Sequence, residues 1–564
     1  MQQKPVYVLG TGLSHDGATC ILKDGELLFA IEKERLTRKK HDGGNDKLTV
    51  QYCLDAAGIT VDDLSLVVQA ANFEKETIAK HKYLGERFFK ADCDVPFVSI
   101  SHHLAHAYSA IGTCPFNDFN ILIIDGCGSR YLQCDDLDGA YIPDQLDGAP
   151  LEKDSFYRYT GNALQPLYKD FSAFSIGGDT LRMPTTQHSI GGLYSMASNY
   201  VFGNMDDVGK LMGLAPYGKR NVIKEKIFRL EGGRVFVNDT LQHLLNRPAG
   251  NYEGFKKDFN YYADIAAWVQ QEVEEAVIYL VKQRNEYAPH PNLCYAGGVA
   301  LNAVANARII RETGIKNLYM TPAAADNGLA IGCAYYGWLE VLKQERRIHN
   351  GSTYLGKPYS DTAIHENIKQ FIADHPKKNV AYKALGADVF NYTATHLANG
   401  KVIGWYQDGA EFGPRALGNR SILADGRKKG VRAFINRDVK FREDFRPFAP
   451  AVMAEDVNQY FCYGYESPYM ILVDQVKDEY KIAHEDIVHV DGSARVQTVT
   501  AQTNAKFYSL LDKFKALTGS SILLNTSLNR KGMPIVETPY EALALFYETA
   551  LDMMVIGNYV FEKA

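Results

Sequence analysis

The sequence predicts an α/β protein of more than one domain, in which one strand-and-turn unit occurs twice. Three observations support this prediction. The chain has 564 residues, which is too long for one ordinary domain and suggests two to four. A strand, a glycine turn and a second strand occur near the start of the chain and again after residue 119. Farther along, a strand, a glycine pair and a helix follow one another around residue 297.

The first unit begins with a predicted strand at residues 6–9, followed by a glycine turn at residues 10–17. A second apolar stretch follows at residues 18–22, and Asp24-Gly25 predicts a hairpin turn before a third strand at residues 27–31. We therefore expect three strands joined by two turns.

The second unit begins at residues 119–124, an apolar run that predicts a buried strand. The run ends in Asp125-Gly126-Cys127-Gly128-Ser129, and a further strand is predicted at residues 131–133. Two glycine turns of this kind indicate a duplicated architecture. The backbone N–H groups of such turns can surround a phosphate, although an ordinary glycine-rich hairpin remains the alternative.

Helices are predicted on either side of the second unit. Residues 95–101 predict a strand and residues 102–111 a helix, with Ser101 as its N-cap. A long helix is predicted at residues 261–284, then a strand at 292–295, the pair Gly297-Gly298, and a helix at 300–311. This order places backbone donors at a helix N-terminus, where an anion or a nucleotide can bind.

A turn-rich stretch near residues 350–360 predicts the domain boundary, which gives domains at residues 1–352 and 353–564. The net charge of −6 and the pI of about 6.2 provide no basic field for nucleic acid or an anionic membrane. No run of 18 apolar residues predicts a membrane span, and the N-terminal residues do not resemble a signal peptide. The nine cysteines form no CxxC pair, which indicates free thiols and a cytoplasmic protein.

His102 and His106 stand four residues apart, so a helix places both rings on one face, where they can hold one metal ion. The alternative is a pair of structural histidines. Two carboxylates favour the metal site: Asp125 follows a predicted strand, and Asp326 lies in a loop before an apolar helix. Nitrogen and oxygen ligands without a thiolate suit Fe(II), Mn(II) or catalytic zinc.

His15 lies beside Asp16 in the first glycine turn. The unperturbed pKa of histidine lies near neutrality, so this side chain can take a proton from an attacking hydroxyl group. A solvated turn histidine is the alternative.

Residues 411–421 combine glycines and a proline with Arg415 and Arg420, and Lys440, Arg442 and Arg446 follow. Guanidinium groups bind phosphate oxygens in a bidentate manner, which indicates an anion site. The alternative is a solvated basic face, but the interleaved Gly, Pro and Phe residues argue against it. Polar residues at 491–497 and 524–529 add further donors, or serve as caps and turns.

With these residues in view, the chain resembles the carbamoyltransferase family of nodulation and antibiotic biosynthesis, the NodU/CmcH group. The matching motifs follow the family order from end to end, and their combination is highly specific. They are Ser14-His15-Asp16 and residues 34–41, 102–106, 209–218, 297–302, 411–421, 445–450, 491–497 and 525–529.

The resemblance implies an N-terminal actin-like ATPase (ASKHA) domain, similar to the threonylcarbamoyl transferases, and a C-terminal YrdC-like α/β domain. In the family, the C-terminal domain makes carbamoyl adenylate from carbamoyl phosphate and ATP with Mg²⁺. The N-terminal domain then transfers the carbamoyl group to a hydroxyl of a small molecule, such as a natural product or a sugar.

The resemblance also assigns roles to individual residues. His102, His106, Asp125 and Asp326 match the family's metal ligands, usually for iron, and His15 matches its general base. The site for carbamoyl phosphate and ATP corresponds to Arg415, Lys440, Arg446, Arg495, Asn525 and Ser527. The nucleotide-contacting turns of the N-terminal domain correspond to Gly126, Gly128, Gly297, Gly298 and Asn302.

Two alternative functions stay open at this point. A tRNA threonylcarbamoyl-type modification enzyme is disfavoured by the acidic pI and the fused second domain. A non-catalytic actin-like nucleotide switch leaves the Arg-rich domain and the His/Asp set without a role. Residues 135–183 follow no family pattern, so the acceptor stays open, as does the choice between a monomer and a homodimer.

Overall fold

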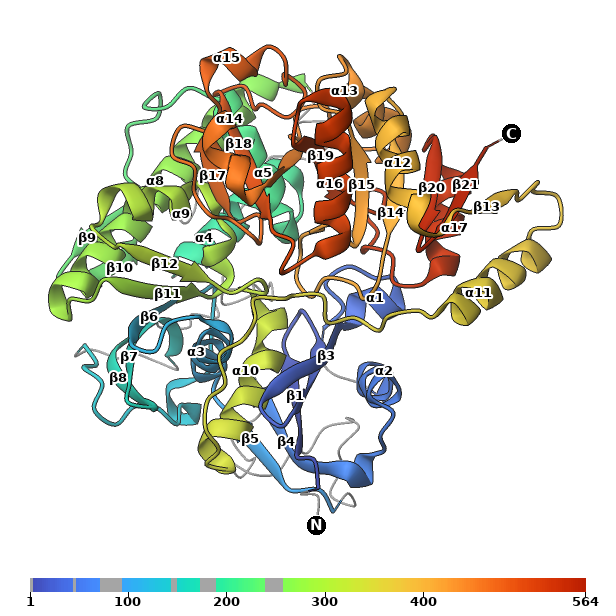
Figure 1. The fold of residues 1–564 in the computed structure, drawn as a ribbon. Coiled ribbons are helices and arrows are strands. Elements are labelled where there is room, and N and C mark those ends of the chain that lie inside the picture. Colours follow the sequence, from blue (N-terminus) through green and yellow to red (C-terminus); the bar gives the residue numbers. More distant parts are fainter. Residues whose placement is uncertain are drawn as a thin grey trace. The chain divides into compact units, whose positions relative to one another are not determined.

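The computed structural model describes residues 4–43, 47–71, 94–143, 150–172, 189–238 and 257–563, which divide into two compact units (Figure 1). The first unit comprises Met1–Lys33 and Gly43–Asn350, and the second comprises Glu34–Asp42 and Gly351–Ala564. The short segment Glu34–Asp42 therefore belongs to the second unit, although it lies within the first by sequence. The domains predicted from the sequence, residues 1–352 and 353–564, are each continuous, so they assign this segment to the first unit.

The described residues of the first unit form two five-stranded sheets. The strands of the first sheet are β1 (Tyr7–Leu13), β2 (Ala18–Lys23), β3 (Glu26–Glu32), β4 (Leu64–Ala71) and β5 (Phe97–Ile100). The strands of the second sheet are β6 (Phe119–Ile124), β7 (Leu151–Thr160), β8 (Ala163–Ser172), β11 (Asn292–Ala296) and β12 (Asn317–Met320).

The two sheets repeat one topology, as the two glycine turns predict. The strand orders are β3-β2-β1-β4-β5 and β8-β7-β6-β11-β12. In each sheet the first three strands of this order pair antiparallel. The fourth strand pairs parallel with the third, and the fifth pairs parallel with the fourth. β6 therefore takes the place of β1, and the turns that follow β1 and β6 carry His15 and Asp125.

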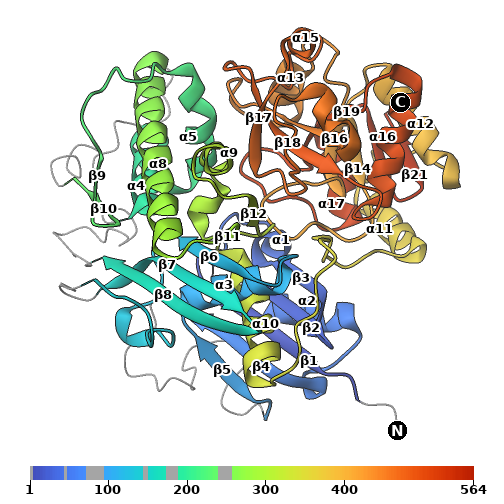
Figure 2. The same cartoon turned by 60° about the vertical axis from the view of Figure 1, so that its left-hand side comes forward.

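Two helices lie between the sheets of the first unit (Figure 2). α10 (Leu329–Tyr336) packs on β1, β2 and β4, while α3 (His102–Thr113) packs on β6, β7 and β11, and the two helices contact each other. α2 (Lys47–Ala57) contacts β2 and β3 on the other face of the first sheet. This arrangement brings the start of α3 and the start of α10 to the ends of β1 and β6.

A helical layer completes the described part of the first unit. It contains α4 (Ile190–Phe202), α5 (Val208–Leu214), α8 (Phe259–Tyr287), α9 (Ala303–Glu312) and the hairpin β9 (Phe228–Glu231) and β10 (Arg234–Val237). The helix predicted at 300–311 begins later than expected, because Gly298–Leu301 form a 3-10 turn. Asn302 then caps α9, its side-chain oxygen accepting the N–H of Ala305 at 3.2 Å.

The strand predicted at residues 131–133 is wrong, because Tyr131–Gln133 form a 3-10 helix. The strand beside β6 is β7 instead. The turn after β6 continues this pairing, since Asp125 and Gly128 donate their N–H groups to the carbonyls of Lys153 and Glu152 at 3.2 and 2.9 Å. A segment of three residues is too short to show the periodicity that separates a strand from a helical turn.

The described residues of the second unit form one nine-stranded mixed sheet. Its strands are β13 (Tyr382–Ala384), β14 (Ile403–Tyr406), β15 (Arg420–Ala424), β16 (Ala449–Met453), β17 (Leu472–Gln475), β18 (Ser493–Val499), β19 (Ile522–Ser527), β20 (Met553–Ile556) and β21 (Tyr559–Glu562). Their order is β13-β21-β20-β14-β15-β19-β16-β18-β17.

The sheet of the second unit has a hydrophobic core on each face. One core includes side chains of α11 (Asp361–Asp374) and α17 (Pro539–Glu548), and the other includes side chains of α12 (Val389–Ala398) and α16 (Ala505–Thr518). Shorter helices are α13 (Val431–Phe434), α14 (Val457–Tyr460) and α15 (Asp478–Lys481). Among the described residues, none of the helices has the length and apolar character needed to cross a bilayer.

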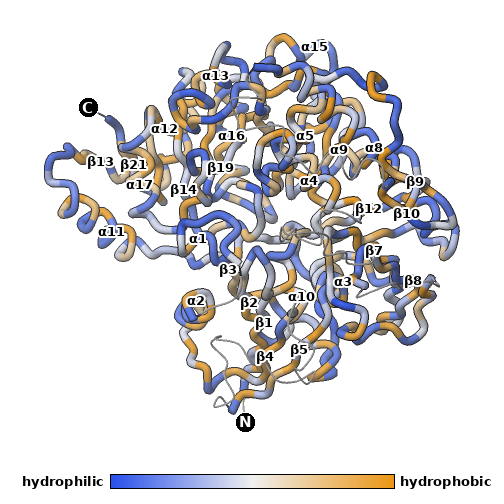
Figure 3. The backbone as a smooth tube through the Cα atoms, turned by 180° about the vertical axis from the view of Figure 1, so that it is seen from behind, coloured by the Kyte–Doolittle hydropathy of each residue, from blue (hydrophilic) through white to orange (hydrophobic). Residues whose placement is uncertain are grey.

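The segment Glu34–Asp42, which contains most of α1 (Lys33–Thr37), is strongly hydrophilic (Figure 3). It is nevertheless anchored in the second unit by arginine side chains. Arg35 donates to the carbonyls of Glu411 and Gly413 at 3.3 and 2.9 Å. Arg38 donates to the carbonyls of Pro534 and Ile535 at 2.8 and 2.7 Å. The second unit is therefore built from two separate parts of the chain.

Candidate metal centre and cation cluster

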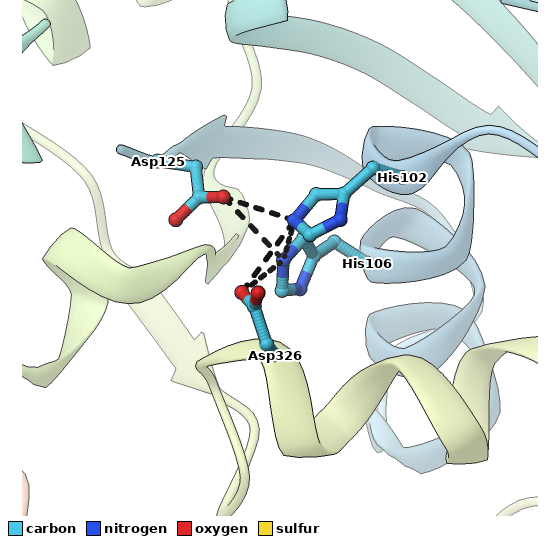
Figure 4. A group of neighbouring side chains, drawn as sticks. All are labelled: His102, His106, Asp125 and Asp326. Atoms are coloured by element: carbon cyan, nitrogen blue, oxygen red, sulfur yellow. Dashed lines mark hydrogen bonds and ion pairs between the residues drawn. The ribbon is translucent and has the colours of Figure 1, made fainter. Parts of the chain in front are cut away.

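Four buried side chains from three elements of the first unit face a common centre (Figure 4). His102 and His106 come from the first two turns of α3, Asp125 directly follows β6, and Asp326 begins the 3-10 turn before α10. One ligand atom from each lies within 4.8 Å of the others. Both histidines are fully buried. The structure thus brings together the four residues proposed from the sequence as metal ligands.

The distances show that the imidazoles and carboxylates point toward one another. His102 Nε2 lies 3.0 Å from Asp125 Oδ2 and 3.5 Å from Asp326 Oδ1. His106 Nε2 lies 3.1 Å from His102 Nε2 and 3.8 Å from Asp326 Oδ1. Two imidazole nitrogens that face each other and two carboxylates are a donor set that fits a divalent transition metal.

The electrostatics of this centre favour positive charge. Burial lowers the pKa of His102, but Asp326 and Asp125 raise it to about 10. Burial raises the pKa of Asp125 and Asp326 repels its charge, yet the two histidines bring this pKa down to about 2. The two carboxylates therefore stay ionised and attract a cation, which is either a proton on an imidazole or a metal ion.

His103 does not belong to this group. Its Nδ1 lies 2.7 Å from Ser155 Oγ, and burial lowers its pKa to about 3, so it is neutral. A second set of ligand-type residues, Cys134, Asp136 and Glu152, lies close by. The Lys169 ammonium already provides the positive charge there, because its Nζ lies 2.5 Å from Glu152 Oε1 and 2.7 Å from Asp136 Oδ1.

His15 lies beside the candidate metal centre. Its Nδ1 is 3.3 Å from Asp326 Oδ2, and its Nε2 is 3.6 Å from Asp16 Oδ2. Ser14 also donates a hydrogen bond to Asp326. Burial lowers the pKa of His15, but the Asp326 carboxylate raises it to about 10. More than half of the His15 side chain is exposed, at 58%, so a reactant can reach it while it contacts a candidate metal ligand.

The candidate nucleotide-contacting glycines surround Asp125. The N–H of Gly298 donates to Asp125 Oδ1 at 2.8 Å, and the carbonyl of Gly126 accepts from Ser189, the N-cap of α4, at 2.6 Å. Gly297 has a φ of +94°, and a side chain there would collide with the carbonyl of Ile124. Asn302 lies apart and bonds with Gln270. Gly298 thus positions Asp125, and the contact of these residues with a nucleotide stays a prediction.

Cationic side chains of the second unit form a cluster of like charges. Burial and the charge of Arg446 lower the pKa of Arg415 to about 10. Burial and the charges of Arg415, Arg442 and Arg446 hold the pKa of Arg495 well below its usual value. The pKa of Lys440 is also well below its usual value, because the side chain is buried near the charges of Arg442, Arg446 and Lys40. Side chains that are far apart in the sequence therefore lie close enough to repel one another.

Two buried donors of this cluster lack a hydrogen-bond partner among the described residues. Among the described residues, the buried Nε atoms of Arg415 and Arg495 have no hydrogen-bond partner. Lys440 is held in place, because its Nζ donates to Ser527 Oγ at 3.1 Å and to Asn529 Oδ1 at 2.5 Å. A bound anion would provide acceptors for these buried N–H groups.

The cluster includes residues beyond the six that the resemblance assigns to the carbamoyl phosphate and ATP site. Arg442 contributes to the repulsion, and Asn529 holds Lys440. Asn525 donates to Gln497 Oε1 at 2.7 Å, which adds Gln497 to the neighbourhood. Arg442 lies in the basic stretch that predicts an anion site, and Gln497 and Asn529 lie in the polar stretches at 491–497 and 524–529. Their residue types alone do not distinguish ligand donors from caps and turns.

Family models match most of the chain. The model described as "Carbamoyltransferase N-terminus" matches residues 8–88 and 61–335, and the model described as "Carbamoyltransferase C-terminus" matches residues 394–563. The first covers the candidate metal centre and His15, and the second covers the cation cluster.

Curated relatives extend over nearly the whole chain. The chain is 33% identical to the Synechocystis sp. protein "Uncharacterized protein sll1178", over 99% of this chain and 97% of that protein. It is 31% identical to "Nodulation protein NolNO" of Sinorhizobium fredii, over 97% and 79%. It is 25% identical to the "3'-hydroxymethylcephem-O-carbamoyltransferase" of Amycolatopsis lactamdurans, over 98% of each. The solved structure of T. kodakarensis HypF is 15% identical, with a TM-score of 0.34 over 61% of this chain and 50% of that one, which is too low to support a conclusion.

Proposed function

We propose that this chain, which belongs to the carbamoyltransferase family and is a transferase enzyme, is an ATP-dependent O-carbamoyltransferase. Its donor would be carbamoyl phosphate, and its acceptor the hydroxyl group of a small molecule. One observation carries the proposal: a buried cluster of like charges in the second unit has guanidinium donors without acceptors. Such a cluster is unfavourable unless an anion binds it.

The first half of the reaction would take place at the cation cluster. Carbamoyl phosphate is hydrolysed to carbamate and inorganic phosphate. A carbamate oxygen then attacks the α-phosphorus of ATP, which releases pyrophosphate and forms carbamoyl adenylate. Arg415, Arg446 and Arg495 would bind the phosphate oxygens and offset the negative charge that builds up in this step, with ATP supplied as its Mg²⁺ complex.

The second half would take place in the first unit. His102, His106, Asp125 and Asp326 would hold Fe(II) or a similar divalent ion, which supplies a Lewis acid when bound. His15 would accept the proton of the acceptor hydroxyl in its neutral form, because a divalent cation bound to Asp326 would offset the carboxylate charge that raises the pKa of His15. Asp326 orients the ring through Nδ1. The hydroxyl oxygen forms a bond to the carbamoyl carbon and AMP leaves. The repeated sheet topology of this unit supports an actin-like fold.

The two halves can be separated by measuring pyrophosphate release from carbamoyl phosphate and ATP without an acceptor. We expect release by the wild type only when both substrates are present. Arg415→Ala should abolish it, because the substitution removes a donor from the phosphate site. His15→Ala should retain it and lose only the transfer step. Arg427→Ala is a matched control, since Arg427 is a partly exposed arginine of the same unit that pairs with Asp425.

Equal loss of pyrophosphate release in Arg415→Ala and His15→Ala would contradict this division between the two units. The acceptor class is tested separately. Hydroxyl-bearing small molecules are incubated with enzyme, carbamoyl phosphate and ATP, and mass spectrometry identifies any product that has gained one carbamoyl group.

A further inference from the structure

The start of helix α3 is capped in an unusual way. Ser101 stands at the N-cap, but its side chain forms no capping hydrogen bond with the helix. Two residues from outside the helix take its place. Ser129 Oγ accepts the N–H of His102 at 2.9 Å, and Glu152 Oε2 accepts the N–H of His103 at 3.2 Å. A carboxylate at this position is also favoured by the positive end of the helix dipole.

The candidate metal ligands of α3 depend on this cap more than histidine ligands usually do. A metal-binding imidazole normally has its second ring nitrogen fixed by a hydrogen bond. Among the described residues, the Nδ1 atoms of His102 and His106 have no such partner. The directions of both rings are therefore set by the backbone of α3, and so by the groups that hold the start of that helix.

Glu152 also holds the turn that carries the candidate ligand Asp125. Its Oε2 accepts the N–H of Ser129 at 2.9 Å, and its own backbone bonds with Gly128 and Ser129. Its second oxygen, Oε1, binds Lys169 at 2.5 Å. A side chain at Gly128 would begin 2.7 Å from Glu152 Oε2, so the turn is packed directly against this carboxylate.

We infer that Glu152 is a positioning residue of the metal centre, which fixes the start of α3 and the turn after β6 in one register. The inference rests on the proposed function in one respect, since it takes His102, His106, Asp125 and Asp326 as metal ligands. Glutamine cannot replace the carboxylate, because its amide has one oxygen and one NH₂ group. If the amide oxygen accepts the N–H groups of α3 and the turn, the NH₂ group faces the ammonium of Lys169. If the amide is reversed, the NH₂ group faces those N–H groups instead.

The test uses Co²⁺ as a spectroscopic probe of the metal-free full-length protein. We expect Glu152→Gln to bind Co²⁺ about 10- to 100-fold more weakly than the wild type. We also expect its visible absorption bands to shift, because the four ligands no longer keep their relative positions. The matched control is Asp154→Asn. Asp154 lies in the same strand, is equally buried and pairs with Arg284 at 2.7 Å, but among the described residues it forms no bond with α3.

A second variant keeps the inference testable if Glu152→Gln does not fold. Ser129→Ala removes the hydroxyl that accepts the His102 N–H and leaves Glu152 in place, and it should weaken Co²⁺ binding and shift the bands in the same direction. Wild-type affinity and wild-type bands in the folded Glu152 or Ser129 variant would overturn the inference, as would an equal change in Asp154→Asn. Equal Co²⁺ binding by the wild type and His106→Ala would instead show that the proposed metal centre itself is wrong.

Discussion

Buried cations have opposite surroundings in two regions of this protein, the ion pairs of the first unit and the cation cluster of the second. In the first unit, Lys169 binds Glu152 and Asp136, and Arg284 binds Asp154, all as close ion pairs. In the second unit, Arg415 and Arg495 mainly face other cations. The carboxylate beside this cluster, Glu443, lies 2.7 Å from Lys531 Nζ and 3.8 Å from Arg446 Nη1.

The difference separates structural charges from charges that serve a ligand. A buried ion is costly unless an opposite charge and hydrogen bonds compensate it. In the first unit the compensation is part of the chain, so the ion pairs hold strands and helices in place. For Arg415 and Arg495 of the second unit, the described residues provide no carboxylate at ion-pair distance, and a phosphate-bearing substrate is the partner that would complete the compensation. Substitutions in the two regions should therefore change stability in opposite directions.

The largest effect is expected from Lys169→Met, which leaves two buried carboxylates without their cation. The free energy of unfolding should fall by about 3–5 kcal/mol, as for a buried pair that loses one partner. The measurement is denaturant unfolding of wild type and variant. Lys226→Met is the control, because this lysine is largely exposed and pairs with Glu272 and Glu275. It should cost less than about 1 kcal/mol.

The Lys169 effect should also depend on pH. Burial alone raises the pKa of Glu152, but Lys169 holds it well below its usual value. Wild-type Glu152 thus adds stability above the unfolded pKa of about 4.3. Without Lys169 the carboxylates can take up protons, so the difference between wild type and variant should shrink from about pH 8 toward about pH 4. A difference that stays constant over this range would contradict the ion-pair explanation.

The local parts of this contrast can be predicted from the sequence. His102 and His106 share a helix face because of their spacing, and the glycine turns after β1 and β6 mark the repeated sheets. Arg415 and Arg446 stand out because glycine, proline and aromatic residues surround them, whereas Arg495 is assigned by the family resemblance. Each of these signals lies within a few residues, where helix and strand periods determine which side chains face the same way.

The remaining features depend on contacts that no short pattern records. Glu152 and Lys169 lie in residues 135–183, which follow no family pattern, and their pairing results from the register of β7 and β8. The segment Glu34–Asp42 is a hydrophilic run whose place in the second unit depends on backbone carbonyls far along the chain. Carbonyl groups are present at every residue, so the sequence cannot show which ones Arg35 and Arg38 will meet.

A smaller effect is expected when an arginine of the cation cluster is replaced by lysine. Arg495→Lys keeps the charge but loses the planar fork that binds two oxygens. Loss of one charge-assisted hydrogen bond should cost about 1.5–3 kcal/mol of carbamoyl phosphate binding. That corresponds to about a 10- to 150-fold weaker affinity, which calorimetry can measure. Arg415→Lys and Arg446→Lys should behave alike, and Arg427→Lys should not. Wild-type affinity in all three cluster variants would show that these arginines do not share a phosphate site.

The smallest effect should have the opposite sign to that of Lys169→Met. Arg495→Met removes a charge that three neighbouring arginines repel, and the new side chain can pack beside Met470, whose sulfur lies 3.8 Å from Arg495 Nη2. The ligand-free variant should therefore be more stable than the wild type, by about 0.5–2 kcal/mol. Saturating carbamoyl phosphate should reverse the order, because a ligand at 100 times its Kd stabilises the wild type by about 2.7 kcal/mol and the variant hardly at all. Thermal unfolding with and without the ligand measures both halves of this crossover. A ligand-free variant that is less stable than the wild type would mean that Arg495 is compensated within the protein, and the contrast between the two units would then fail.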